Sequence, residues 1–235
     1  KDGHPVGAEA LLRWTHPRLG PISPAEFIPL AEHVGLIQQV GDFVIRNGLR
    51  QLARWHAAGH EDMRLSINVS PRQFREESLA ENLLVALDTF GLSPRSVSIE
   101  ITEGVLMSGA ESVMRTLRTL REHGVGVVMD DFGTGFSSLS YLRDYPFDVL
   151  KIDRRFVQGV ETDKADLQLV VSAIRLGQAL GMTVVAEGVE TEGQDTLLRR
   201  EGCEFAQGYR YGHPMPAEEF LEALQRPVSV SAAEQ

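Results

Sequence analysis

Residues 127–137 read VVMDDFGTGFS, an apolar run that ends on two adjacent carboxylates, Asp130 and Asp131, and passes into a glycine-rich turn. The apolar, β-branched part is typical of a buried strand. Neighbouring carboxylates repel each other, and near a core of low dielectric constant one of them would take up a proton. Both can stay ionised if a cation lies between them. The alternative is that Asp130 ends the strand and Asp131 caps a turn that contains Gly133 and Gly135.

Similar apolar runs recur along the chain, and a helical pattern follows each of them. The strand candidates are residues 5–12, 65–69, 97–102, 125–130, 148–152, 183–187 and 205–209. Amphipathic helices are expected at residues 24–35, from about 38 to 58, and at 77–91, 112–124 and 165–181. Near-continuous hydrophobic strands that alternate with helices indicate a parallel sheet that is covered on both faces.

Seven such units in 235 residues predict a TIM-like (β/α)8 barrel that lacks one strand, and an open doubly wound sheet is the alternative. Seven polar residues each lie in or at the end of a different strand candidate, namely Glu9, Asn68, Glu100, Asp130, Lys151, Glu187 and Gln207. In a barrel such residues converge at the carboxyl-terminal mouth, where active sites of this fold lie. In an open sheet only those near the switch point would meet. The pattern therefore favours the barrel.

Composition excludes several classes of protein. The net charge of −10 argues against a nucleic-acid polymer as the partner, because such binding needs a basic surface. An acidic protein can still bind an anionic substrate if metal ions reverse the local charge. The single cysteine, Cys203, permits no internal disulfide, which suits a reducing compartment and a cytoplasmic location. No apolar run approaches the ~18 residues that a membrane span needs, so we expect no membrane contact from this segment.

The strand-end residues supply oxygen ligands and no imidazole or thiolate. The candidate metal ligands are Glu9, Asn68, Glu100, Asp130, Asp131 and Glu187. This set suits Mg²⁺ or Mn²⁺ rather than zinc or copper. Because its five carboxylates would leave a single divalent ion heavily outweighed by negative charge, we expect two ions. Asp130 then bridges the two metals, while Asp131 binds only the second, as in centres that cleave phosphate esters.

Two cationic residues complete the candidate site. Lys151, in the run VLKID, is expected to orient and help deprotonate an attacking water, or to stabilise charge in the transition state. A plain surface lysine is the alternative. Arg13, four residues after Glu9, is expected to hold a phosphate through two parallel hydrogen bonds, and a buried ion pair is the alternative.

Together these residues stand in motifs that resemble those of the EAL-domain family, bacterial phosphodiesterases that act on cyclic di-GMP. The motifs follow in order as EALLRW at 9–14, INVSP at 67–71, EITE at 100–103, DDFGTGFSSLSYL at 130–142, LKID at 150–153, AEGVE at 186–190 and QGY at 207–209. The match runs from about Val6 to Pro216. The resemblance implies two-metal hydrolysis of cyclic di-GMP to linear 5′-pGpG, which lowers the level of this second messenger in bacterial signalling.

The resemblance also implies roles for single residues. Ligands of the first metal would be Glu9, Asn68, Glu100 and Asp130, and those of the second Asp130, Asp131 and Glu187. Lys151 would hold the nucleophilic water beside Glu187 and Asp131, and the substrate-binding or supporting residues would be Arg13, Asp153 and Gln207. Glu103 and Glu190 are similar to residues that anchor the loop after the Asp130–Asp131 pair, a loop also used in dimer contacts, so a homodimer is expected. We expect Ca²⁺ to inhibit, because it is larger and acidifies bound water less.

Family members normally carry a further strand, with a YQP-type motif, before the position where this sequence begins. The expected barrel therefore lacks its first strand, with residues 1–226 forming an N-terminally truncated EAL domain and residues 227–235 a loose tail. We expect an upstream sensor or GGDEF-type domain in the full-length protein, which can also carry a membrane anchor. Two other functions fit less well: a catalytically silent receptor for cyclic di-GMP, and an enolase-type barrel in which a lysine abstracts a proton.

Overall fold

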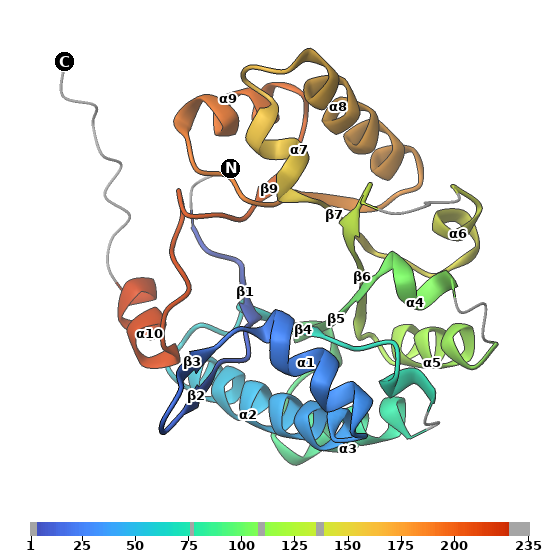
Figure 1. Ribbon diagram of the computed structural model, residues 1–235, viewed down its shortest axis with the longest axis vertical. Coiled ribbons are helices and arrows are strands. Elements are labelled where there is room, and N and C mark those ends of the chain that lie inside the picture. Colours follow the sequence, from blue (N-terminus) through green and yellow to red (C-terminus); the bar gives the residue numbers. More distant parts are fainter. Residues whose placement is uncertain (1–3, 76–77, 108–110, 135–138, 226–235) are drawn as a thin grey trace.

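The centre of the molecule is an all-parallel sheet of seven strands, in which spatial order follows chain order (Figure 1). The strands are β1 (Gly7–Ala10), β4 (Arg64–Asn68), β5 (Val97–Thr102), β6 (Gly126–Phe132), β7 (Val149–Ile152), β8 (Thr183–Ala186) and β9 (Phe205–Ala206). The computed structural model describes residues 4–75, 78–107, 111–134 and 139–225. The expected tail at 227–235 lies outside the described residues.

The two edge strands of this sheet meet at their carboxyl ends. The side-chain amide of Gln207, which follows β9, donates a hydrogen bond of 2.8 Å to Glu9 of β1. An open sheet would keep its edge strands far apart, so the sheet curls as in a TIM-like barrel. The expectation of a barrel is confirmed, and the open doubly wound sheet is excluded.

Helices cover the outside of the curled sheet. They are α1 (Pro24–His33), α2 (Ile37–Ala57), α3 (Leu79–Thr89), α4 (Glu103–Met107), α5 (Glu111–Glu122), α6 (Leu139–Asp144), α7 (Arg154–Gly159), α8 (Lys164–Ala179), α9 (Glu192–Arg200) and α10 (Ala217–Gln225). Each of the five helices that the sequence predicts is present within two residues of its expected ends. The five others have at most nine residues each, too short for a helical period to stand out.

The main core lies between these helices and the sheet. Helix α2 buries Ile45, Leu49 and Leu52 on one face, as the helical spacing of four and three residues requires. These side chains join Leu65 and Ile67 of β4 in one apolar cluster. Since alternate residues of β4 point to opposite faces, Ser66 and Asn68 lie on the face away from this cluster.

A short antiparallel hairpin, β2 (Trp14–His16) and β3 (Gly20–Ile22), precedes α1 and was not predicted. Trp14 packs edge-on against Phe27 of α1, with ring centroids 5.7 Å apart. This contact packs the hairpin against α1. Among the described residues, no helix combines the length and the apolar character that a membrane crossing requires.

Candidate active site

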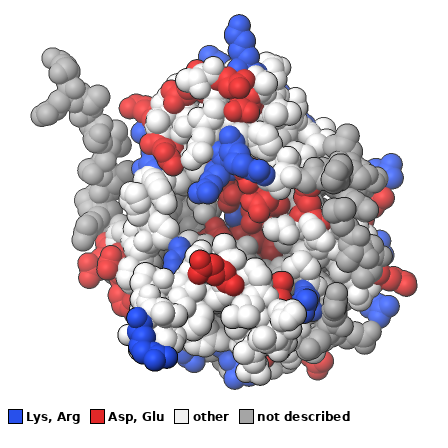
Figure 2. All heavy atoms as spheres, in the orientation of Figure 1, with Lys and Arg blue, Asp and Glu red and all other residues white. Residues whose placement is uncertain are grey.

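The strand-end residues that the sequence singles out gather at the carboxyl-terminal mouth of the sheet. Figure 2 shows Asp and Glu side chains at the bottom of a hollow in this face, with Lys and Arg on its border. The residues come from every strand of the sheet: Glu9 from β1, Asn68 from β4, Glu100 from β5, Asp130 and Asp131 from β6, Lys151 from β7, Glu187 from the end of β8 and Gln207 from the end of β9.

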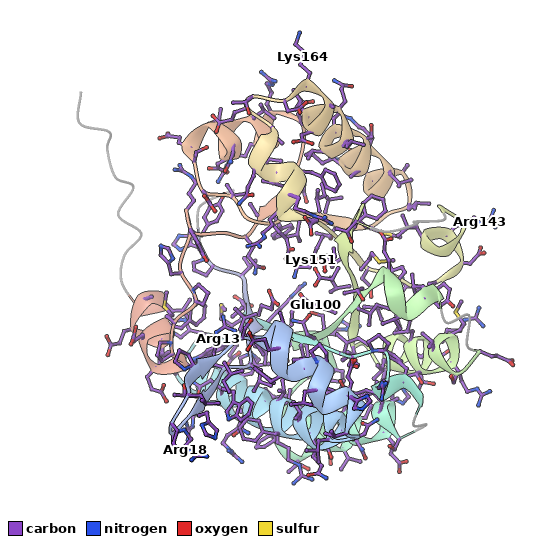
Figure 3. The ribbon with its side chains drawn as sticks, viewed as in Figure 1. Arg13, Arg18, Glu100, Arg143, Lys151 and Lys164 are labelled. Atoms are coloured by element: carbon purple, nitrogen blue, oxygen red, sulfur yellow. The ribbon has the colours of Figure 1, made fainter. Side chains whose placement is uncertain are left out.

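Lys151 lies in the middle of this acidic group, and its side chain is only 4% exposed. Its ammonium Nζ lies 2.6 Å from Glu187 Oε1, 2.8 Å from Glu100 Oε2, 3.4 Å from Asp130 Oδ1 and 3.6 Å from Glu9 Oε2. In Figure 3 Lys151 and Glu100 lie toward the centre of the molecule, whereas Arg18, Arg143 and Lys164 point outward. The alternative of a plain surface lysine is therefore wrong.

These neighbours also determine the charge of Lys151. Burial lowers the pKa of its ammonium group, but the four surrounding carboxylates outweigh burial and raise the pKa above its ordinary value. A lysine that stays protonated donates hydrogen bonds and cannot accept a proton. In the metal-free chain, therefore, Lys151 can orient a water or stabilise charge, but it is not placed to take a proton from that water.

Glu9 is held by two amide side chains. Asn68 Nδ2 donates to Glu9 Oε1 at 2.7 Å, and Gln207 Nε2 donates to Glu9 Oε2 at 2.8 Å. Burial raises the pKa of Glu9, but Lys151 and these two amides outweigh it, so that the pKa lies below its ordinary value. Glu9 is therefore ionised, and both of its oxygens have a defined direction.

Three other carboxyl groups of the cluster, those of Glu100, Glu187 and Asp131, hold their protons unusually tightly. Burial raises the pKa of Glu100 to about 8 and that of Glu187 to about 7, although Lys151 opposes it in both cases. Burial, the neighbouring charge of Asp130 and contact with Asp153 raise the pKa of Asp131 to about 6. One ammonium group is thus too little positive charge for this many buried carboxylates.

The backbone of β6 explains how two adjacent carboxylates reach the same site. Successive side chains of a regular strand point to opposite faces of the sheet. Here the register with β7 shifts between Met129 and Phe132, and Asp131 has φ +54°, the one positive value among the described non-glycine residues. Such a conformation costs about 1–2 kcal/mol for a residue with a side chain. It allows the oxygens of Asp130, Asp131 and Glu187 to lie within 4.8 Å of one another.

The residues of the cluster fit divalent cations. Asp130 Oδ1 is buried and has no hydrogen-bond partner among the described residues, a condition that is rare for a buried carboxylate oxygen. Its neighbours Asp131 and Glu187 supply hard oxygen ligands of the kind that Mg²⁺ and Mn²⁺ prefer. When all five carboxylates are ionised, the single positive charge of Lys151 leaves four negative charges in excess. Two divalent ions would neutralise them. The donor set, the charge and the Asp130 oxygen that lacks a hydrogen bond all agree with a pair of such ions.

The two substrate-binding candidates lie at the border of the cluster. Asp153 is 7% exposed and caps α7, because its Oδ1 accepts a hydrogen bond of 2.7 Å from the backbone N–H of Arg155. It also lies within hydrogen-bonding reach of Asp131. Arg13 is exposed and donates to the carbonyl of Leu12 at 3.0 Å, which contradicts the alternative of a buried ion pair for this residue.

The two candidate loop anchors differ in what they contact. Glu103 is 8% exposed and begins α4, and its Oε1 accepts a hydrogen bond of 3.0 Å from the backbone N–H of Gly133, two residues after Asp131. The exposed Glu190 accepts from Gln158 Nε2 at 3.5 Å. Residues 135–138, where the rest of the loop runs, lie outside the described residues.

Sequence reasoning missed two residues beside the cluster. A hollow of about 180 Å³ between the ends of β8 and β9 is lined by Glu187 and Gln207 together with Arg154 and Tyr209. Both Arg154 and Tyr209 are exposed. The sequence signal that could have found them is their position, because Arg154 directly follows the candidate Asp153 and Tyr209 lies two residues after the candidate Gln207. Exposed arginines and tyrosines are too common for that signal to stand alone.

Comparison with known proteins places these features in a family. The EAL domain family model matches residues 1–214. The chain is 43% identical over 223 residues to the bifunctional diguanylate cyclase/cyclic di-GMP phosphodiesterase MucR of Pseudomonas aeruginosa, and 42% identical over 227 residues to the cyclic di-GMP phosphodiesterase NbdA of the same organism. Each alignment covers 95% of this chain, which spans 33% of MucR and 29% of NbdA.

Solved structures agree with the sequence comparison. The PaMucR phosphodiesterase in complex with c-di-GMP superposes with a TM-score of 0.87 and 43% identity, over 92% of this chain and 87% of that one. The EAL enzyme Bd1971, bound to cAMP and cyclic di-GMP, superposes with a TM-score of 0.89 and 34% identity, over 94% and 60%. By the family match, the relatives and the superpositions, this chain belongs to the EAL domain family.

Proposed function

We propose that this chain is a cyclic di-GMP phosphodiesterase, which hydrolyses one phosphodiester bond of cyclic di-GMP to linear 5′-pGpG with the help of two divalent cations, Mg²⁺ or Mn²⁺. One observation carries the proposal: the buried Lys151 ammonium lies among four carboxylates at the mouth of the barrel. Support comes from MucR and NbdA, which are named for this activity, and from PaMucR, whose similar structure is a complex with c-di-GMP.

The proposed metal ligands divide into two sets that share Asp130. The first set is Glu9, Asn68, Glu100 and Asp130, and the second is Asp130, Asp131 and Glu187. Bound divalent ions would neutralise the phosphate oxygens and lower the pKa of an attacking water. The raised pKa values of Glu100 and Glu187 support this assignment, because added positive charge would release their protons.

The side chains of the protein itself would orient the reactants. Lys151, whose ammonium pKa the surrounding carboxylates raise in the metal-free chain, would donate a hydrogen bond to the attacking water. The water oxygen forms a bond to phosphorus, the bond from phosphorus to the 3′ oxygen breaks, and that oxygen takes up one proton. Asn68 and Gln207 hold Glu9 in one orientation throughout. Arg13 and Asp153, at the border of the cluster, would bind the remaining part of the substrate.

Chromatography of cyclic di-GMP incubated with the chain tests this proposal. After removal of metal with a chelator, added Mn²⁺ should convert the substrate to a single product that is one water heavier. Glu9→Gln should abolish the conversion. Tight binding of cyclic di-GMP without conversion, at any metal concentration, would assign the chain a receptor function instead. A chain that neither binds nor converts cyclic di-GMP would contradict the proposal altogether.

We propose further that the chain acts as a homodimer in the bacterial cytoplasm, next to a sensor or GGDEF-type domain. Support comes from the names and lengths of the relatives: MucR also carries the name of a diguanylate cyclase, and the chain is 42% identical to the oxygen sensor protein DosP of Escherichia coli, of which it spans 27%. Sedimentation of the purified chain at several concentrations tests for the dimer.

A further inference from the structure

Asp195 of α9 lies outside the acidic cluster and holds the chain segment that follows β9. Its side chain is 12% exposed, and its Oδ1 accepts a hydrogen bond of 2.8 Å from the hydroxyl group of Tyr211. Its Oδ2 lies 3.4 Å from Arg210 Nε. Arg199, one helical turn further along α9, donates to Oδ1 at 2.7 Å. Two of the three partners of Asp195 thus belong to one short segment, residues 207–211.

This segment carries Gln207, whose amide orients Glu9. The backbone N–H of Gln207 donates to Ala186 O at 2.8 Å, and the N–H of Val189 donates to Gln207 O at 3.0 Å. The backbone N–H of Arg210 donates a hydrogen bond to Val189 O at 3.1 Å. The segment is therefore bonded to the loop that carries Glu187, another proposed metal ligand.

The close contact between these two loops depends on Gly208. Its φ is +155°, and a Cβ at this position would lie 2.2 Å from Val189 O, so a residue with a side chain could not fit. The two loops therefore pack in direct backbone contact. A displacement of residues 210 and 211 would be passed to Gln207 through three residues of backbone.

The first turn of α9 holds the loop that carries Glu187. Gln194 Oε1 accepts from the backbone N–H groups of Glu190 and Thr191, at 2.7 and 3.1 Å. The hydroxyl group of Thr191 donates to Glu161 Oε2 at 2.6 Å. Helix α9, which lies beside β9 in Figure 1, thus fastens the loop after β8 with its first turn and the segment after β9 with Asp195.

Burial of apolar surface does not account for the contacts of Asp195. Tyr211 is 45% exposed, and the side chain of Arg210 is 31% exposed, so neither contributes much to a core. Hydrogen bonds to a charged group have a preferred direction, whereas apolar contacts have little. The contacts of Asp195 are thus suited to setting the position of the segment.

We infer that Asp195 is a positioning residue for the proposed metal centre: through Tyr211 and Arg210 it keeps Gln207 where the amide donates to Glu9. The inference rests on the proposed function, because Glu9 is a metal ligand only under that proposal. Partners of metal ligands typically change metal affinity about 10- to 100-fold when they are removed. Asp195 acts through Gln207, so its removal should weaken Mn²⁺ binding by about 10-fold, the lower end of that range.

The experiment measures Mn²⁺ affinity of the metal-free chain by electron paramagnetic resonance, and hydrogen exchange at the amides of Val189 and Arg210. Asp195→Ala should weaken Mn²⁺ binding about 10-fold and speed exchange at both amides. Asp195→Asn keeps an acceptor for Tyr211 and should restore part of the affinity. In a Gln207→Ala background, Asp195→Ala should have almost no further effect on Mn²⁺ affinity, because its route to Glu9 is already lost.

Glu201→Gln is the matched control. It removes a carboxylate that pairs with Arg200 at 3.2 Å, at the far end of the same helix, and should leave Mn²⁺ affinity unchanged. If Asp195→Ala does not fold, Tyr211→Phe removes the 2.8 Å bond while keeping the ring, and should weaken Mn²⁺ binding in the same direction.

Unchanged Mn²⁺ affinity in the folded variants would overturn the inference. So would a double variant whose loss of Mn²⁺ affinity equals the product of the losses caused by Asp195→Ala and Gln207→Ala alone. A wild-type chain that binds no Mn²⁺ would overturn it together with the metal assignment. A wild-type chain that binds Mn²⁺ but leaves cyclic di-GMP intact would contradict the proposed function alone, since the Mn²⁺ measurements would still decide the role of Asp195.

Discussion

Replacing Lys151 by methionine tests the most distinctive feature of the site. Methionine keeps most of the volume of the lysine stem but removes the ammonium group, which contacts Glu187 at 2.6 Å and Glu100 at 2.8 Å. If Lys151 orients the attacking water, the loss should appear in kcat, while KM should change little. KM should stay near the wild-type value because the metals and Arg13 are expected to hold the substrate phosphates.

The expected size of the effect follows from the charge and burial of this group. Lys151 is 4% exposed, and as an ammonium group it would give water in the transition state a charged hydrogen bond from a buried position. A hydrogen bond to a charged group contributes about 1.5–3 kcal/mol. Since each 1.36 kcal/mol is tenfold in rate, kcat should fall about 10- to 150-fold, with ~10²-fold as the central expectation.

Steady-state kinetics with cyclic di-GMP and saturating Mn²⁺ provide the measurement. Thermal unfolding with and without Mn²⁺ serves as the control, because loss of the ammonium leaves the carboxylates facing one another and can destabilise the metal-free chain. A variant that turns over normally at saturating substrate would refute the reasoning. A raised KM with an unchanged kcat would instead make Lys151 a phosphate ligand.

The remaining predictions concern the metals, pH and the single cysteine. Asp131→Asn should nearly abolish turnover but leave substrate binding measurable by calorimetry, because Asp131 serves mainly the second metal; a kcat near the wild-type value would contradict two-metal catalysis. Ca²⁺ should compete with Mn²⁺ and slow turnover in a rate assay, since it tolerates irregular coordination geometry and lowers the pKa of bound water less. Turnover with Ca²⁺ as fast as with Mn²⁺ would contradict this expectation. In the folded, metal-free chain the pKa of Glu100 is raised from 4.5 to about 8 and that of Glu187 to about 7, so the folded state binds more protons than the unfolded state in this range. Its free energy of unfolding should therefore fall as pH rises from 4.5 to about 8, which urea denaturation at each pH would show, and added Mn²⁺ should reverse the trend. Cys203 is 7% exposed, and burial raises the pKa of its thiol to about 11. A thiol reagent should therefore modify Cys203 only as fast as the chain unfolds.

Local sequence patterns were sufficient for the sheet and for the list of polar residues at its mouth. A strand such as VSIEIT at 97–102 shows its apolar character and its single carboxylate within six residues, and the structure has this strand with the same ends. Parallel strands in a barrel necessarily present their carboxyl ends at one mouth. The sequence alone therefore predicts that Glu9, Glu100 and Lys151 meet. The short helices and the hairpin at residues 14–22 could not be predicted, because too few residues carry each pattern.

Only the tertiary structure decided how these residues act on one another. The contact between Lys151 and Glu9 joins residues 142 positions apart in sequence, and no periodicity encodes its distance of 3.6 Å. The positive φ of Asp131 depends on the shifted pairing of β6 with β7, which is a relation between two strands. Asp195 shows no signal in the sequence, since its partners Arg210 and Tyr211 reach it only because α9 packs beside the end of β9. Residue type and local period are properties of the chain, whereas charge, pKa and orientation depend on neighbours that folding brings together.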